Sequence, residues 1–142
     1  MTLHKQGAIL NYKLNKREGL HMQDINTSTT NLNDYTVQDI VLIKEAALQH
    51  ARDAAQAHLD THGEQAYCGF AWINIYGIKG NTKLGKRMKA AGIEKDYSGA
   101  YSIWNPSGMG TQCMSTKEAG AYAAAKVFTA AGFECYAGSR AD

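Results

Sequence analysis

The sequence lacks several features that define whole classes of proteins. No stretch approaches the roughly 20 consecutive apolar residues that a membrane-spanning helix needs. Residues 1–19 include basic side chains but only a short apolar run at 7–10, so no secretory signal is expected. A large excess of one charge is also missing, because the formal net charge is +2. We therefore expect a cytoplasmic protein without a membrane partner, and any anionic partner must be argued from where the charges lie.

Cysteine is scarce and not arranged for metal binding. The three cysteines, Cys68, Cys113 and Cys135, are an odd number and have no CxxC spacing. They predict buried thiols and neither a disulfide framework nor a zinc site. His58 and His62 stand four residues apart, but no convincing third ligand accompanies them. No metal or other cofactor is predicted.

The 142 residues leave room for one domain. Residues 1–33 are polar and predict an N-terminal arm or linker, whereas 34–142 predict a single α+β domain. Apolar residues recur at helical spacing over 34–62, which predicts a long helix that Gly63 ends.

Residues 67–138 predict a compact core after this helix. Runs of aromatic and β-branched residues indicate strands, and alanine-rich runs between them indicate helices. Ser115 and Glu118 have capping-box spacing, which predicts a helix start there. The expected segments are a strand at 67–76, a helix at 82–91, strands at 101–104 and 111–114, a helix at 115–131 and a strand at 133–137. This β-α-β-β-α-β order predicts a ferredoxin-like sandwich, with the long N-terminal helix as an addition.

The first strand has two unlike faces, because side chains alternate along a strand. One face carries small and aliphatic residues that suit the two helices: Gly69, Ala71, Ile73 and Ile75. The other face carries Cys68, Phe70, Trp72, Asn74 and Tyr76, which Trp104 and Tyr136 could join. Three alternatives stay open for covering these rings: the long helix, a second copy of the chain, or stacked bases.

A cluster of positive charge follows this strand. Lys79, Lys83, Lys86, Arg87 and Lys89 occur without an intervening acidic residue. Lys83, Lys86 and Arg87 share one side of the expected helix, opposite Leu84, Met88 and Ala91. Asn81 or Thr82 can cap its start, where free amides favour anions, although the GxxxxGK[ST] motif is absent. The alternatives are a solvated helix face or contact with an acidic protein.

No catalytic residue is assigned. Cys113 has no obvious base near it in sequence, and a nucleophile needs one in space. Glu94, Asp96 and Glu134 offer no recognisable acid and base pair. The loop at 104–112 is either a hairpin turn or a ligand-binding loop.

Five short motifs carry a likeness to other proteins: GFAW at 69–72, GNTKLG at 80–85, IWNPS at 103–107, KEAG at 117–120 and YAGSR at 136–140. Through these motifs, residues 68–142 resemble small uncharacterised proteins encoded by bacteriophages. The resemblance implies a phage origin and a place in the host cytoplasm. It implies no activity and assigns no functional residue.

The leading hypothesis is therefore a non-enzymatic phage protein that binds a nucleotide or nucleic acid. The expected phosphate contacts are Lys79, Asn81, Thr82, Lys83, Lys86 and Arg87, and the expected stacking residues are Phe70, Trp72 and Trp104. The alternative is a protein–protein module that either forms a homo-oligomer or inhibits a host protein. An enzyme is the third hypothesis.

Overall fold

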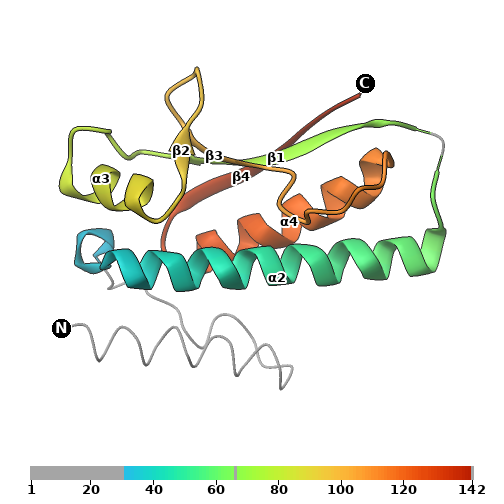
Figure 1. Cartoon of the computed structure of the whole chain (residues 1–142), viewed down its shortest axis with the longest axis horizontal. Coiled ribbons are helices and arrows are strands. Elements are labelled where there is room, and N and C mark those ends of the chain that lie inside the picture. The colour runs from blue at the N-terminus through green and yellow to red at the C-terminus, as the bar shows by residue number, and fades with distance from the viewer. Residues whose placement is uncertain (1–30, 66, 142) are drawn as a thin grey trace.

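The computed structural model describes residues 31–65 and 67–141 (Figure 1). The arm predicted at 1–33 thus lies almost entirely outside the described residues. The described part combines helices with a four-stranded antiparallel sheet, which confirms the α+β class. Its elements are η2 (Leu32–Asp34), α2 (Val37–His62), β1 (Gly69–Tyr76), α3 (Lys83–Ala90), β2 (Glu94–Lys95), β3 (Tyr101–Trp104), α4 (Met114–Ala130) and β4 (Glu134–Ala141).

The four strands lie in the order β2-β3-β1-β4, and each neighbouring pair is antiparallel. Strand β1 is central and pairs over its whole length with β4. Trp72 of β1 lies opposite Trp104 of β3 on one side and opposite Gly138 of β4 on the other. These three positions therefore share one face of the sheet.

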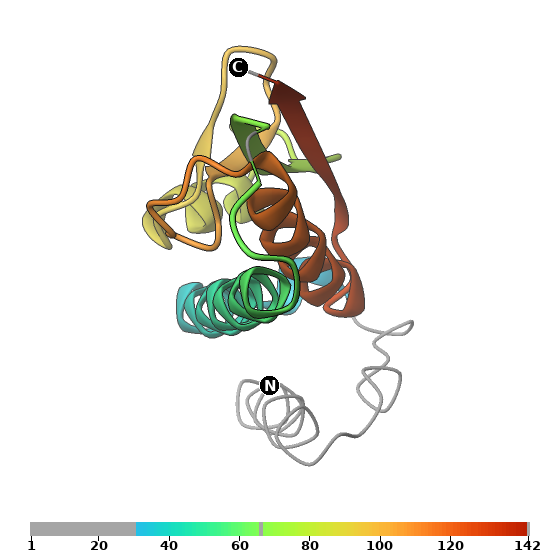
Figure 2. The same ribbon diagram turned by 90° about the vertical axis from the view of Figure 1, so that its right-hand side faces the viewer.

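Helices α3 and α4 lie on one face of the sheet, and α2 lies beyond α4 as an outer layer (Figures 1 and 2). Long helix α2 therefore does not cover the aromatic face, so that alternative is wrong for α2. The cause is its stripe of small residues, since Ala47, Ala51 and Ala55 are all fully buried. At Gly120 of α4, an added Cβ would lie 3.1 Å from the Ala51 carbonyl oxygen, so the two helices approach closely. Such a surface packs best against another small-residue helix.

Two of the expected helix boundaries are explained by local bonds. Helix α2 begins at Val37 rather than 34, because Leu32–Asp34 forms a 3-10 turn. Thr36 and Asp39 form a reciprocal capping box, in which the Thr36 hydroxyl accepts from the Asp39 amide and the Asp39 carboxylate accepts from the Thr36 amide. The helix ends before Gly63, whose φ of 68° confirms the expected stop.

The prediction of a strand at 111–114 is wrong. The strand before β3 is Glu94–Lys95, and residues 111–114 form no strand of the sheet. Only Cys113 makes an isolated bridge there, with Cys68. The Ser115 capping box is also wrong, because α4 has already begun at Met114 with Cys113 in the N-cap position.

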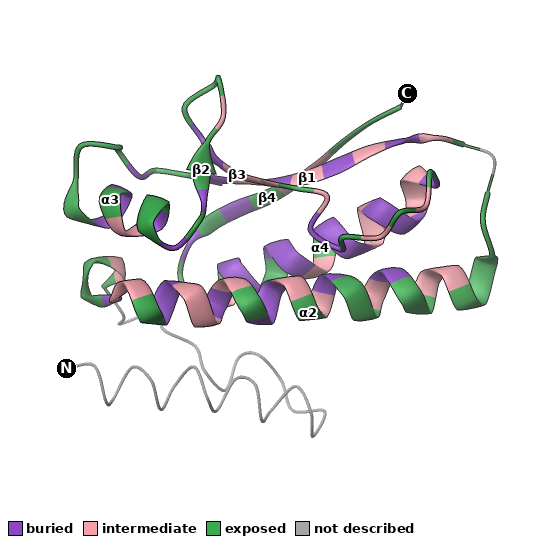
Figure 3. Ribbon diagram, viewed as in Figure 1, coloured by how far each residue is buried: buried purple, intermediate pink, exposed green. Residues whose placement is uncertain are grey.

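The buried core lies between the sheet and its helices (Figure 3). Ala71, Ile73 and Ile75 of β1 are fully buried, which confirms the expected inner face. Leu84 and Met88 of α3 are buried beside them, as its helical spacing predicted. Within the described residues, none of the helices combines the length and apolar character needed to span a bilayer.

Candidate functional site

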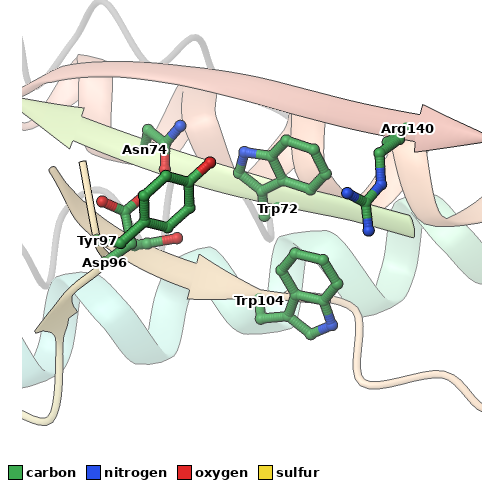
Figure 4. Close-up of a pocket in the computed structure, with 7 residues that line it drawn as sticks. Trp72, Asn74, Asp96, Tyr97, Trp104 and Arg140 are labelled. Atoms are coloured by element: carbon green, nitrogen blue, oxygen red, sulfur yellow. The ribbon is translucent and has the colours of Figure 1, made fainter.

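The open side of the sheet carries a pair of indole rings. Trp72 and Trp104 lie opposite each other on β1 and β3, with ring planes parallel to within 2° and centroids 5.3 Å apart. Trp72 is half-buried, whereas Trp104 keeps 57% of its surface exposed. In Figure 4 the two indoles stand in front of the strands, and the helices lie behind. The pair forms a broad apolar surface that meets solvent.

Gly138 of β4 leaves the space that the Trp72 ring occupies. A Cβ added at Gly138 would lie 2.7 Å from Nε1 and 2.8 Å from Cε2 of Trp72, which is closer than atoms can pack. The indole therefore lies against the β4 backbone, in the space that a side chain would otherwise occupy. The glycine makes a flat ring position possible.

A polar network holds the same ring from its edge. When the Asn74 amide is oriented with its oxygen toward the donors, that oxygen accepts from Trp72 Nε1 and from the Tyr76 hydroxyl, each at 3.2 Å. The amide nitrogen then donates to Ser102 Oγ at 3.3 Å. Contact with the β4 backbone at Gly138 and the hydrogen bond to Asn74 thus fix the orientation of the Trp72 ring. A ring that is already ordered lowers the entropic cost of binding a ligand.

Beside the indoles lies a hollow of about 420 Å³. Its lining consists of Trp72, Asn74, Asp96, Tyr97, Ser102, Trp104 and Arg140. Arg140 stands at one end, and Asp96 and Tyr97 stand at the other, on the turn between β2 and β3 (Figure 4). The hollow thus has an aromatic wall, with the Arg140 guanidinium at one end and the Asp96 carboxylate at the other.

Asp96 is occupied with its own turn. Its Oδ1 accepts from the Ser98 hydroxyl at 2.6 Å, the Ser98 amide at 2.8 Å and the Ala100 amide at 3.3 Å. The Ser98 hydroxyl is the main cause that lowers the pKa of Asp96, and the backbone amides add to it against a smaller opposing effect of burial. Tyr97 next to it is fully exposed. The carboxylate thus shapes the turn that presents Tyr97 beside the hollow.

Phe70, one of the predicted stacking residues, lies next to Trp104. It does not line the hollow, and its ring centroid lies 5.6 Å from that of Trp104. The Lys117 ammonium lies 5.3 Å from the ring centroid, and the Arg140 guanidinium carbon lies 5.8 Å from it. The Phe70 ring therefore packs beside the Trp104 ring and helps to position Arg140 through a cation–π contact.

The predicted phosphate contacts on α3 lie on the other side of the sheet. Lys79, Asn81, Lys83 and Lys86 are exposed there. Thr82 is the N-cap of α3, since its hydroxyl accepts from the Gly85 amide at 3.0 Å. The sheet therefore separates the predicted lysines from the predicted aromatic residues, which do not form one continuous site.

Arg87, also a predicted phosphate contact, is hydrogen-bonded to backbone carbonyls of the same chain. Its Nη1 donates to the Asn33 carbonyl at 2.7 Å and to the Tyr35 carbonyl at 3.1 Å, which ties α3 to the start of α2. An arginine placed three residues before the last residue of a short helix looks the same in sequence whether it contacts backbone carbonyls or a phosphate. Only the tertiary placement of residues 33–35 distinguishes the two.

A second hollow, of about 440 Å³, lies between α3 and β2. Three lysines line it, Lys86, Lys89 and Lys95, together with one carboxylate, Glu94. Lys95 immediately precedes Asp96 of the first hollow. The edge of the sheet that β2 and β3 form thus separates the lysine-lined hollow from the aromatic one, because Tyr101 lines the first and Ser102 lines the second.

Several residues of the site escaped prediction. Arg140, Tyr97, Ser102 and Gly138 come to the indoles from β4, β3 and the turn before β3. Their positions depend on strand register, which the sequence does not reveal without the pairing partners. Within the described residues, histidines, cysteines and acidic side chains form no group of three or more that could hold a metal. Comparison with protein-family models, with curated proteins and with solved structures finds no match for this chain.

Proposed function

We propose that this chain is a non-enzymatic bacteriophage protein that binds a nucleotide or single-stranded nucleic acid on the open face of its sheet. The observation that carries the proposal is the parallel Trp72–Trp104 pair, which stands on a face that α2, α3 and α4 leave uncovered. Stacking of a base on an aromatic side chain contributes about 1–3 kcal/mol. Because every base has a flat face, such a surface accepts many sequences.

We further propose that residues 69–141 adopt the ferredoxin-like arrangement. The element order β-α-β-β-α-β, the sheet order β2-β3-β1-β4 and the antiparallel pairing support it. In that arrangement the helices occupy one side, and the two central strands present their outward side chains to a ligand. Here the central strands are β3 and β1, which carry Trp104 and Trp72.

The charges around the hollow favour one orientation of a nucleotide. With a base against the indoles, its phosphate lies best near Arg140, because a guanidinium pairs with phosphate in bidentate geometry. The Asp96 carboxylate at the other end repels phosphate and can accept hydrogen bonds from the amino groups of a base. A mononucleotide would therefore use the aromatic hollow alone.

A longer strand could reach the basic helix around the edge of the sheet. Lys95 lies beside Asp96, and Lys86 and Lys89 line the same hollow as Lys95. A strand that leaves the indoles over β2 would place its next phosphates among these three ammonium groups. Binding of oligonucleotides should thus be tighter and more sensitive to salt than binding of mononucleotides.

Quenching of tryptophan fluorescence by oligothymidylate at low salt tests the proposal. The Trp104→Ala variant should lose about 5- to 150-fold in affinity, the equivalent of one stacked base. Tyr122→Ala is the matched control, because Tyr122 is exposed to a similar extent, 58%, but lies on α4 away from this face. Absence of binding to any nucleotide or oligonucleotide at low salt would end the proposal.

A protein–protein module is the second candidate, favoured by the exposed rings that flank the indoles. Tyr76 and Tyr136 are 42% and 59% exposed, and their ring centroids lie 6.0 Å apart on the same face. Large exposed aromatic patches commonly mark protein interfaces. Sedimentation at increasing concentration distinguishes the two: a dimer that Trp104→Ala converts to a monomer, with no nucleotide binding, supports self-association. Retrieval of a host protein by the wild type but not by Trp104→Ala supports a role as an inhibitor.

A further inference from the structure

Cys68 and Cys113 face each other across a β-bridge. The flanking hydrogen bonds run from the Gly69 amide to the Gln112 carbonyl at 3.2 Å and from the Met114 amide to the Tyr67 carbonyl at 3.0 Å. This pattern makes the cysteines a non-hydrogen-bonded antiparallel pair, in which Cα atoms lie about 4.5 Å apart and side chains share one side. Disulfides span Cα separations of about 4.4–6.8 Å. The backbone thus already holds the two residues at bridging distance.

The surroundings of Cys113 favour its thiolate. Cys113 is the N-cap residue of α4, where amide groups point outward and the helix dipole is positive. Burial acts to raise the pKa of this thiol, but hydrogen bonds from the Thr116 hydroxyl and from the amides of Gln65, Thr116 and Ser115 outweigh it and leave the pKa lowered. Reactive thiols in proteins commonly have this environment.

A polar chain leads from this thiol toward the surface. Thr116 is fully buried, and its Oγ1 lies 3.2 Å from Nδ1 of His58 on α2. The Thr116 hydroxyl thus stands between the thiol and an imidazole that is half-buried. A proton leaving the Cys113 sulfur has a hydrogen-bonded route to His58.

We propose that Cys68 and Cys113 are a redox-active dithiol that a small-molecule disulfide, such as oxidised glutathione, converts to an intramolecular disulfide. The half-buried Cys68 thiolate attacks one sulfur of the reagent, forms a mixed disulfide and expels one thiolate. The Cys113 thiolate then attacks the Cys68 sulfur, forms the Cys68–Cys113 bond and expels the second thiolate. The protein loses two protons and two electrons, and the reagent takes them up as two thiols.

The remaining cysteine supplies an internal control. Cys135 is buried, and burial raises its pKa to about 12, so it stays a thiol under conditions where the pair reacts. It lies on β4 opposite Ile75 rather than opposite a cysteine. The same chain therefore contains an inert buried thiol beside the proposed pair.

Incubation of the native protein with oxidised glutathione, followed by mass spectrometry and thiol counting after denaturation, tests the proposal. The wild type and Cys135→Ser should each lose two thiols and two mass units without a glutathione adduct. Cys113→Ser should instead keep a stable glutathione adduct on Cys68. Cys68→Ser should form no internal disulfide.

Thermal unfolding gives a second readout. Oxidation should raise the Tm of the wild type by about 10 °C, because the new bond closes a long loop, and should leave the Tm of Cys68→Ser unchanged. Three remaining thiols in the wild type, a stable wild-type glutathione adduct, or loss of the internal disulfide in Cys135→Ser would each overturn the proposal. None of these readouts depends on nucleic-acid binding.

Discussion

The two faces of strand β1 differ although they belong to the same eight residues. Ala71, Ile73 and Ile75 are completely buried against the helices, and their small or branched shapes follow from packing. On the opposite face Trp72 is half-buried and Tyr76 is exposed, so packing within the described residues does not explain their large rings. A protein that needed only to fold could carry polar residues there. The inner face thus accounts for the fold, and the outer face is where we propose that a ligand binds.

The largest expected effect is a loss of stability from a substitution on the inner face. Ile73→Ala removes a fully buried side chain from the centre of the sheet and should cost about 2–5 kcal/mol in the free energy of unfolding. Trp104→Ala removes a larger but mostly exposed ring and should cost about 1 kcal/mol or less. Urea unfolding of both variants measures the difference. Equal losses would mean that the outer face is also part of the core.

The second prediction disturbs the outer face without removing a ring. Gly138→Ala places a methyl group where the Trp72 indole lies and should tilt or displace that ring. Affinity for oligothymidylate should fall by about 1–3 kcal/mol, with a shift in tryptophan emission, since one stacking surface is lost. Gly110→Ala is the control, because nothing lies within 4 Å of an added Cβ there. Unchanged affinity in Gly138→Ala would show that the flat Trp72 position is irrelevant to binding.

The third prediction separates structure from binding on α3. Arg87→Ala removes two hydrogen bonds to the Asn33 and Tyr35 carbonyls and should cost about 1–2 kcal/mol in the free energy of unfolding. Lys83→Ala removes only an exposed side chain and should stay within about 0.5 kcal/mol. Chemical denaturation measures both. If the two variants were equally stable, the tie between α3 and the start of α2 would be unimportant.

The predictions from sequence succeeded where a local pattern determines the structure. Alternation in β1 gave the correct two faces, and helical spacing gave the buried side of α3, because both depend only on neighbouring residues. Thr82 and Gly63 act as the expected helix cap and stop for the same reason.

The predictions failed where the structure depends on which strands pair, or on which of two neighbouring residues becomes the helix cap. Strand β2 is two exposed residues, Glu94 and Lys95, and has no apolar alternation to reveal it. Ser115 has a capping-box sequence, but Cys113, which forms the bridge with Cys68, is the N-cap two residues earlier, and α4 starts at Met114. Arg140 joins the site only through the β1–β4 register, which places it opposite Phe70.

The smallest expected effect concerns the turn that presents Tyr97. The pKa of Asp96 is lowered in the folded protein, chiefly by the Ser98 hydroxyl, so ionised Asp96 stabilises the fold above its unfolded pKa of about 3.9. That contribution is lost as the pH falls through the lower folded pKa. Because solvent screens this carboxylate, the change should be below about 1 kcal/mol.

Carboxyl titration by NMR measures the Asp96 pKa directly. Ser98→Ala removes the main cause of the shift and should bring that pKa back toward its ordinary value. The variant should also loosen the turn and weaken any contact that Tyr97 makes with a ligand in the hollow, while Trp72 and Trp104 stay in place. A normal Asp96 pKa in the wild type would contradict the hydrogen bonds of this turn. An altered Trp72 environment in Ser98→Ala would show instead that the turn and the indole pair depend on each other, so that the outer face behaves as one unit.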